Sequence, residues 1–230
     1  MRIRAVLFDI DLTLLDAGGA GRRAMERAME RCWNVLDAAS GISFGGRTDP
    51  WLIREMMKGR VPETHHTDDA IRTVIETYLE LLPLELATSG GARPLPGVRP
   101  LLDELEALGV ALGLATGNVQ RGARIKLQSA GGLERYFHFG GYGDDDANRN
   151  VLTARGLQRA QQRVTGLAAH EVALVGDTPH DITAGRSIGA FTVGVATGRS
   201  TVAELHAAGA DAVLVDLSAP DVLLQRCRRA

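Results

Sequence analysis

Short apolar runs alternate with helical patterns along most of this chain, and this alternation constrains the fold more than any other feature. The sequence predicts strands at 3–10, 110–115, 172–175, 191–195 and 212–215, with a further short strand at 137–139. Helical patterns lie between them, at 101–108, 121–130, 151–164, 181–188 and 202–208, and a last helix ends the chain. Alternating strands and helices favour a parallel sheet with helices on both faces. We therefore expect an α/β, Rossmann-like three-layer core.

Residues 20–87 interrupt this alternation. Met25, Met29, Cys32 and Leu36 recur at steps of four, three and four residues, which marks the apolar stripe of a helix. A second helical pattern covers 71–82, and residues 88–97, rich in glycine and proline, are typical of a linker. The sequence thus predicts an all-helical domain at 17–93, inserted into a core domain made of 1–16 and 94–230.

Composition excludes several classes of protein. The chain has 230 residues and a formal net charge of -2, which lacks the basic excess of a nucleic-acid-binding surface. Its two cysteines cannot build a disulfide framework, and no apolar run approaches the roughly 20 residues that cross a bilayer. We expect a cytoplasmic protein without nucleic-acid or membrane partners; its oligomeric state is left open.

Acidic residues follow the first predicted strand, in the pattern Asp9-x-Asp11-x-Thr13. Carboxylates two residues apart project to the same side of an extended chain, where they repel each other unless a cation or a shared proton intervenes. Such a pair suits a hard divalent ion such as magnesium, which prefers oxygen ligands. The alternative is a solvated turn after a strand.

Two further polar groups follow later strands. Thr116-Gly117-Asn118 offers a hydroxyl and free backbone N–H groups to an anion, although an ordinary helix N-cap explains the same residues. Asp177 ends another strand, and Asp181 follows one helical turn later; a first-turn acid favoured by the helix dipole is the alternative for Asp181. In open α/β sheets ligands bind beyond the carboxyl ends of the strands, where all these residues are expected.

Taken in this order, the three motifs resemble those of the haloacid dehalogenase-like hydrolase superfamily, and the helical insert after the first motif resembles the small cap of its phosphoglycolate phosphatase-like members. The resemblance implies that Asp9 is a nucleophile and Asp11 a general acid and base. It also implies phosphate binding by Thr116, Gly117 and Asn118. A magnesium ion would be held by Asp9, the main-chain carbonyl of Asp11, Asp177 and Asp181.

The family also uses a basic residue between its second and third motifs, commonly a lysine before a proline, and this chain departs from that pattern. Arg149 is the best match in position, and Lys126, within the preceding helix, is the runner-up. Asp144, Asp145 and Asp146 lack the spacing of a calcium loop; we expect a solvated turn that could hold Arg149 in place.

The inserted domain is expected to contribute to substrate choice. Arg47, Thr48 and Asp49 lie in a glycine-rich turn between its helices and are candidates to reach the substrate, against the alternative of an N-cap turn before Trp51. The glycines at 18, 19 and 21 are expected to form a hinge.

These expectations define a magnesium-dependent phosphatase that hydrolyses a small phosphorylated metabolite through an aspartyl-phosphate, with phosphoglycolate as the leading example. A sugar-phosphate mutase of the same superfamily retains both aspartates and stays open as an alternative. A non-catalytic module that binds a phospho-ligand is the rival from another class, and would be expected to have lost Asp9 or Asp11. The natural substrate is not predicted.

Overall fold

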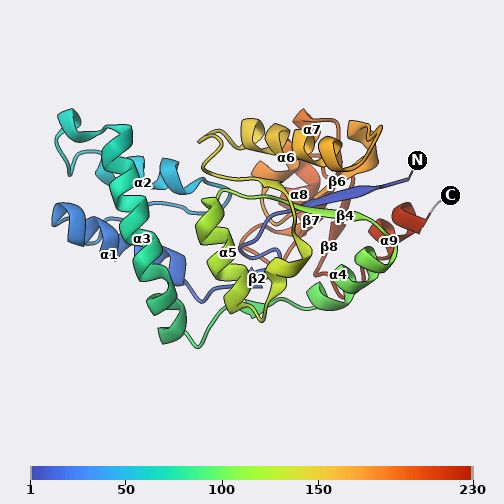
Figure 1. Cartoon of the computed structure of the whole chain (residues 1–230), viewed down its shortest axis with the longest axis horizontal. Coiled ribbons are helices and arrows are strands. Elements are labelled where there is room, and N and C mark those ends of the chain that lie inside the picture. Colours follow the sequence, from blue (N-terminus) through green and yellow to red (C-terminus); the bar gives the residue numbers. More distant parts are fainter. Residues whose placement is uncertain (1, 229–230) are drawn as a thin grey trace.

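The chain folds around a six-stranded parallel sheet; the structure, a computed structural model, describes residues 2–228. The strand order is β5-β4-β1-β6-β7-β8, so that β1 lies in the middle of the sheet (Figure 1). The strands are β1 (Ala5–Phe8), β4 (Ala111–Ala115), β5 (Gly140–Gly141), β6 (Val172–Gly176), β7 (Phe191–Val195) and β8 (Ala212–Leu214). The predicted Rossmann-like α/β core is therefore confirmed.

Helices cover both faces of the sheet, and the side chains of each central strand divide between two apolar clusters. In β1, Val6 and Phe8 belong to one cluster, whereas Ala5 and Leu7 belong to the other. This is the two-residue alternation of a strand that is buried on both faces. The first cluster includes residues of α4 (Val98–Ala107), α5 (Gln120–Ser129) and α9 (Asp221–Arg228), and the second includes residues of α6 (Arg149–Arg163) (Figure 1). Helices α7 (Pro179–Ser187) and α8 (Val202–Ala207) complete the layers.

The chain between β1 and α4 forms a helical unit beside one end of the sheet (Figure 1). Its helices are α1 (Ala20–Trp33), α2 (Asp49–Met57) and α3 (Asp68–Thr88), with a 3-10 turn η1 (Glu63–His65). Helices α1 and α3 pack together, and Glu85 of α3 accepts hydrogen bonds from Arg23 and Arg27 of α1. The predicted all-helical insert is confirmed. The segments that lead into and out of it pair as a short antiparallel ribbon of β2 (Leu15–Asp16) and β3 (Arg93–Pro94).

Some local predictions were wrong. A 3-10 turn, η2 (Leu133–Tyr136), precedes an edge strand at Gly140–Gly141, whereas the sequence predicted a strand at 137–139. A Cβ atom on Gly141 would lie 1.8 Å from the carbonyl oxygen of Leu152, so α6 passes too close for any side chain. A strand made of two glycines has no apolar pattern to detect. The predicted linker also contains β3, and a third 3-10 turn, η3 (Ala169–Glu171), precedes β6.

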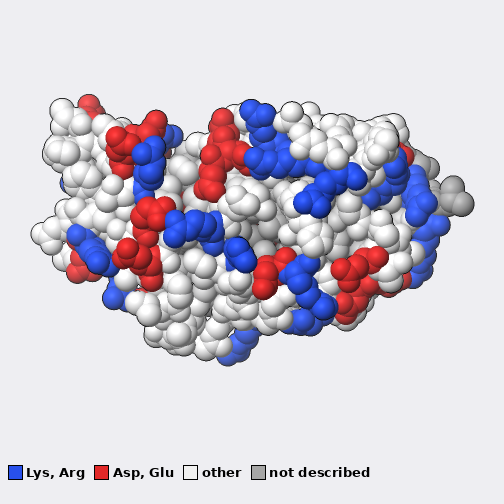
Figure 2. Space-filling view, in the orientation of Figure 1, with Lys and Arg blue, Asp and Glu red and all other residues white. Residues whose placement is uncertain are grey.

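The surface shows no large basic patch on the face drawn in Figure 2, where Lys and Arg side chains lie among Asp and Glu side chains. None of the helices in residues 2–228 combines the length and the apolar character that crossing a membrane requires.

Candidate active site

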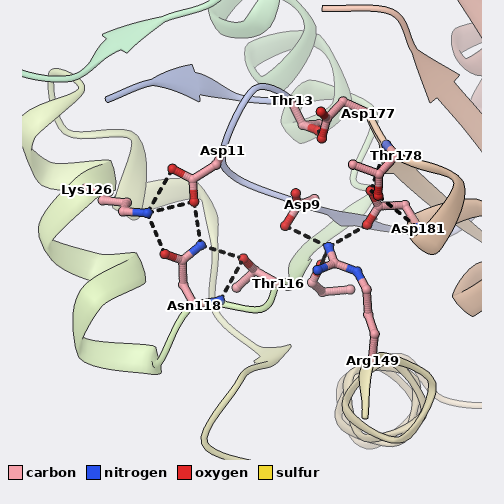
Figure 3. Close-up of polar contacts among 11 residues, drawn as sticks. Asp9, Asp11, Thr13, Thr116, Asn118, Lys126, Arg149, Asp177, Thr178 and Asp181 are labelled. Carbon is pink, nitrogen blue, oxygen red and sulfur yellow. Dashed lines mark hydrogen bonds and ion pairs between the residues drawn. The ribbon is translucent and has the colours of Figure 1, made fainter. Parts of the chain in front are cut away.

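Three neighbouring strands bring the predicted motifs together. Phe8 of β1 lies opposite Leu114 of β4 on one side and Val175 of β6 on the other. Because the three strands are parallel and in this register, the residues that follow them meet at one edge of the sheet. Asp9, Thr116 and Asp177 are those residues, and Figure 3 shows their side chains around a common space.

Asp9, Asp177 and Asp181 form a buried cluster of acids. One carboxylate oxygen from each lies within 4.8 Å of the others, and none of the three residues is more than 6% exposed. Burial, together with the neighbouring carboxylates, raises the pKa of Asp9 to about 6 and that of Asp177 to about 8. Three buried carboxyl groups with oxygens this close together can serve as ligands for a cation.

Arg149 is the protein's own cation in this cluster. It is the first residue of α6, is 9% exposed, and its guanidinium lies 2.9 Å from Asp9 and 2.5 Å from Asp181. Burial opposes the charge, but the two carboxylates outweigh it and raise the pKa of Arg149 further above its ordinary value. The other oxygen of Asp181 accepts hydrogen bonds from the backbone N–H and the hydroxyl of Thr178, at 3.0 and 2.6 Å. Asp181 thus orients Arg149 and caps α7 at the same time.

A second charged cluster lies on the other side of Asp9 and contains Lys126, Asp11, Asn118 and Thr116 (Figure 3). The ammonium of Lys126, which is 5% exposed, donates to both oxygens of Asp11 at 2.8 and 2.7 Å and to Asn118 Oδ1 at 2.7 Å. The amide of Asn118 donates in turn to Asp11 and to the Thr116 hydroxyl, each at 2.8 Å. The network fixes the orientation of the Asp11 carboxylate.

The acidic side chains of the first and third motifs are divided between these two clusters. The carboxylates of Asp9, Asp177 and Asp181 come together, but the carboxylate of Asp11 turns toward Lys126 and lies outside that group. The expectation that the side chains of Asp9 and Asp11 share one cation does not agree with this arrangement, because each carboxylate pairs with a different basic residue.

The acidic turn at 144–146 does not hold Arg149. Asp145 pairs with Arg159 at 2.7 Å, and Asp144 accepts the backbone N–H of Gln120 at 2.8 Å. The suggested contact with Arg149 is corrected accordingly: Asp9 and Asp181 hold that arginine.

The turn before α2 contacts the core directly. Thr48 is 1% exposed; its hydroxyl caps α2 by accepting the N–H of Trp51 at 3.4 Å and donates to the carbonyl of Ala147 at 3.1 Å. Asp49 accepts the N–H of Val119 at 2.9 Å, and its own N–H donates to the carbonyl of Gly117 at 2.8 Å. Thr48 therefore follows the N-cap alternative, and Asp49 attaches the insert to the core loop.

A cavity of about 470 Å³ opens between the insert and the core. Arg47 lines it, with its guanidinium 4.4 Å from the ring centroid of Trp51. His180 also lines it, and burial followed by the charge of Arg47 lowers the pKa of His180. The lining further includes acids and bases of both clusters and several apolar side chains: Asp9, Asp11, Asp49, Lys126, Arg149, Asp177, Leu12, Met25, Phe44, Leu52 and Tyr78.

Sequence reasoning missed some residues of this cavity. Tyr78 lines it, although its place in the α3 pattern marked it only as a helix-core residue. Arg199 and Ser200, in the loop after β7, carried no recognisable motif. Thr13, whose hydroxyl donates to Asp177 at 3.3 Å, was visible in the first motif without an assigned role.

Comparison with known proteins identifies the family. Residues 6–195 match the family model described as haloacid dehalogenase-like hydrolase, so the chain belongs to this family. It is 28% identical over 203 residues to a probable phosphatase, IndB, of Dickeya dadantii (strain 3937), covering 88% of this chain and 85% of that protein. It is also 27% identical to the phosphoglycolate phosphatase of Shigella boydii serotype 4 (strain Sb227), covering 97% and 89%.

The fold agrees with that of a solved structure. The crystal structure of CbbY from Rhodobacter sphaeroides in complex with phosphate superposes with a TM-score of 0.73 at 17% identity, covering 94% of this chain and 96% of that chain. At this identity the similarity supports the fold alone.

Proposed function

We propose that this chain is a magnesium-dependent phosphatase that hydrolyses a small phosphomonoester through an aspartyl-phosphate on Asp9. The observation that carries the proposal is the position of Asp9: a buried carboxylate at the floor of the cavity, 2.9 Å from Arg149 and grouped with Asp177 and Asp181. An anionic nucleophile needs such positive charge beside it before an anionic phosphate can approach. Family membership and near full-length similarity to two phosphatases support the broader assignment: the chain is a phosphoric monoester hydrolase.

In the proposed reaction, an oxygen of Asp9 attacks phosphorus in line with the leaving oxygen and forms the acyl phosphate, which water then hydrolyses. The phosphoryl oxygens are bound by Arg149, the hydroxyl of Thr116 and the backbone amides of Gly117 and Asn118. Donors placed in advance stabilise the transition state without the cost of reorganising solvent.

Magnesium fits the donor set of this site. Asp9 and Asp177 are buried carboxylates grouped with Asp181, and hard oxygen donors suit magnesium. We propose Asp9, Asp177 and the main-chain carbonyl of Asp11 as its ligands. Both oxygens of Asp181 are occupied by Arg149 and Thr178, so Asp181 acts through a water molecule or by orientation. The chemistry that magnesium supplies when bound is neutralisation of the carboxylates and polarisation of the phosphoryl oxygens.

Asp11 is the proposed general acid and base: it protonates the leaving oxygen and later takes a proton from the attacking water. Lys126 and Asn118 hold its carboxylate, because their three donors contact both of its oxygens. We therefore assign the basic, phosphate-stabilising role to Arg149 and the orientation of Asp11 to Lys126.

We also propose that residues 17–93 act as a cap domain on a core of 1–16 and 94–230. The β2–β3 ribbon lies at both proposed boundaries, and Gly18 and Gly19, with φ of 57° and 75°, provide the hinge. Arg47 is the cap residue proposed to reach the substrate, since it lines the cavity, whereas Thr48 does not. A cytoplasmic location stays a prediction.

Magnesium-dependent release of inorganic phosphate from an aryl phosphate tests this function, with wild type and Asp9→Asn assayed side by side. The proposal expects activity in the wild type that a chelator removes and magnesium restores, and a loss of at least about 10³-fold in Asp9→Asn. Equal rates in the two proteins would remove Asp9 from the mechanism. If a sugar phosphate supplied as substrate is isomerised and no phosphate is released, the result would support the mutase alternative. If a phosphorylated ligand is bound but not converted, the result would support a regulatory module. Phosphoglycolate is the first natural ester to assay.

A further inference from the structure

Tyr78 has a buried hydroxyl without a hydrogen-bond partner in the part of the chain that the structure describes. The residue lies on α3, is 0% exposed and lines the cavity, and among residues 2–228 its hydroxyl has no hydrogen-bond partner. An unsatisfied buried polar group costs about 1–3 kcal/mol, so nearly all such groups in folded proteins have a partner, a water molecule or a ligand. Opposite this hydroxyl stands Gly122 of α5, where an added Cβ would lie 3.3 Å away.

Asp49 is the second incompletely satisfied group of this region. One of its carboxylate oxygens accepts the N–H of Val119, whereas no hydrogen bond reaches the other oxygen from the described part of the chain. Burial raises the pKa of Asp49 to about 7, even though Lys126 and the Val119 N–H lower it. Val119 links the two groups, because it donates to Asp49 and an added Cβ on Gly122 would lie 3.3 Å from both the Val119 side chain and the Tyr78 hydroxyl. Asp49 and Tyr78 line the same cavity.

These two groups lie on the leaving-group side of the site. Lys126 occupies the α5 face one turn after Gly122, and its ammonium contacts Asp11, the proposed general acid. A general acid must lie beside the oxygen that it protonates, so in the proposed reaction the alcohol part of the substrate would extend toward Lys126, Asp49 and Tyr78. The phosphoryl group would lie beside Asp9 and Arg149, which pair at 2.9 Å.

We propose that Tyr78 and Asp49 form a subsite that binds a hydroxyl group of the substrate's alcohol, so that the preferred leaving group is a polyhydroxylated alcohol. The inference rests on the proposed phosphatase function and narrows its substrate. A hydroxyl group matches both partners, because it donates to the carboxylate of Asp49 and accepts from the phenol of Tyr78. A carboxylate at this position, as in glycolate, would face the charge of Asp49 instead.

The size and lining of the cavity agree with a leaving group of this kind. Its volume of about 470 Å³ falls within the roughly 300–1,000 Å³ of pockets that enclose drug-sized ligands, and exceeds the needs of a two-carbon acid. Met25, Phe44 and Leu52 supply apolar surface for the carbon skeleton of such an alcohol.

Substrate selectivity of Tyr78→Phe tests the subsite. Values of kcat/KM for phosphate release would be measured with glucose 6-phosphate, 2-phosphoglycolate and p-nitrophenyl phosphate. We expect wild type to prefer glucose 6-phosphate over 2-phosphoglycolate. In Tyr78→Phe the ratio of kcat/KM for glucose 6-phosphate to that for p-nitrophenyl phosphate should fall about tenfold, because only the sugar ester loses a hydrogen bond. Asp49→Asn should lower the same ratio.

Tyr142→Phe is the matched control, since this buried tyrosine lies outside the cavity lining, and the ratio should stay at the wild-type value. An equal fall for all three esters in Tyr78→Phe would show a structural role and overturn the inference. An unchanged ratio of the two kcat/KM values in Tyr78→Phe would also overturn it, because this is expected if only water binds the Tyr78 hydroxyl. A wild-type preference for 2-phosphoglycolate would overturn it as well. Each of these results requires an active wild type and leaves the phosphatase function intact. Failure of the function itself appears differently, as equal rates in wild type and Asp9→Asn.

Discussion

Arg149 and Lys126 are two buried cations at one site, and their surroundings differ in a way that separates two tasks. Arg149 lies among Asp9, Asp177 and Asp181 and pairs with two of them. Lys126 donates hydrogen bonds to one carboxylate, that of Asp11, and to an amide oxygen. The first cation offsets negative charge where the phosphate would arrive, whereas the second orients one side chain. Two cations of equal formal charge thus have different proposed tasks: Arg149 binds the phosphate, and Lys126 positions the Asp11 carboxylate.

The residue types suit these tasks. One terminal nitrogen of Arg149, Nη2, contacts Asp9, Asp181 and the carbonyl of Ala115, so the other guanidinium nitrogens would be available to a phosphoryl oxygen. The three donors of Lys126 are all used, by two oxygens of Asp11 and one of Asn118. Lys126 therefore has no donor left for a phosphoryl oxygen unless it releases Asp11.

The largest effect is expected from Arg149→Met. This change removes the cation that pairs with Asp9 in the described residues and breaks its pair with Asp181 as well, so kcat/KM for an aryl phosphate should fall about 10³-fold or more. Urea unfolding should show a loss of about 3 kcal/mol of stability. Arg159→Met, which breaks only the pair with Asp145, is the control and should retain activity within about threefold. Turnover by Arg149→Met close to that of the wild type would contradict this assignment and indicate that Lys126 stabilises the phosphate.

Lys126→Met should have an intermediate effect that depends on the leaving group. Loss of the orientation of Asp11 should lower kcat about 10- to 100-fold for an alkyl phosphate, which needs protonation, and less for p-nitrophenyl phosphate, which does not. In an Asp11→Asn background the same change should cost nothing further, because Lys126 acts through Asp11. Additive losses in the double variant would instead indicate direct contact of Lys126 with the substrate.

A smaller effect is expected from Asp49, whose contribution to the free energy of unfolding should depend on pH. Its pKa is about 7 in the folded protein against an ordinary 3.8, so the folded state retains the proton that the unfolded state loses. The contribution of Asp49 to the free energy of unfolding should therefore fall as pH rises from about 4 to about 7, by roughly 2–4 kcal/mol. Chemical unfolding across this range should show that decline in wild type relative to Asp49→Asn. Parallel pH profiles for the two proteins would mean that Lys126 fully compensates the carboxylate.

The smallest expected effect is the stabilisation of the folded protein by magnesium, which should depend on the acid cluster and not on Lys126. Saturating magnesium should stabilise wild type by about 1–3 kcal/mol, seen as a higher Tm, because it binds the folded acid cluster and not the unfolded chain. Lys126→Met should keep this shift and Asp177→Asn should lose it. A shift that survives in Asp177→Asn would place the ion elsewhere.

The sequence predicted the fold class and most acidic residues of the site because both depend on position along the strands. Asp9, Thr116 and Asp177 follow strands, and parallel neighbouring strands bring them to one edge of the sheet. The roles of Arg149 and Lys126 could not be separated in advance, since each depends on how a helix is rotated about its axis against the sheet. Helices α5 and α6 carry too little apolar pattern to fix that rotation to within one residue.

Tyr78 and the strand at Gly140–Gly141 are two features that the hydrophobic pattern of the sequence could not predict. Tyr78 occupies a core position of α3, and only the packing of the insert against α5 reveals that its hydroxyl lacks a partner. Gly141 leaves room for α6, and Gly140 leaves room for Leu114 of β4, so both constraints lie outside the strand's own sequence. Thr48 shows the reverse case, because its N-cap role was already visible as an alternative.

Mass spectrometry of the acid-quenched enzyme tests the central claim most directly. Wild type mixed with magnesium and excess aryl phosphate, quenched during turnover and digested, should yield a phosphorylated peptide whose modified residue is Asp9. The same peptide from Asp9→Asn should carry no phosphoryl group. A phosphoryl group on another residue, or turnover without any phosphorylated protein, would contradict the account.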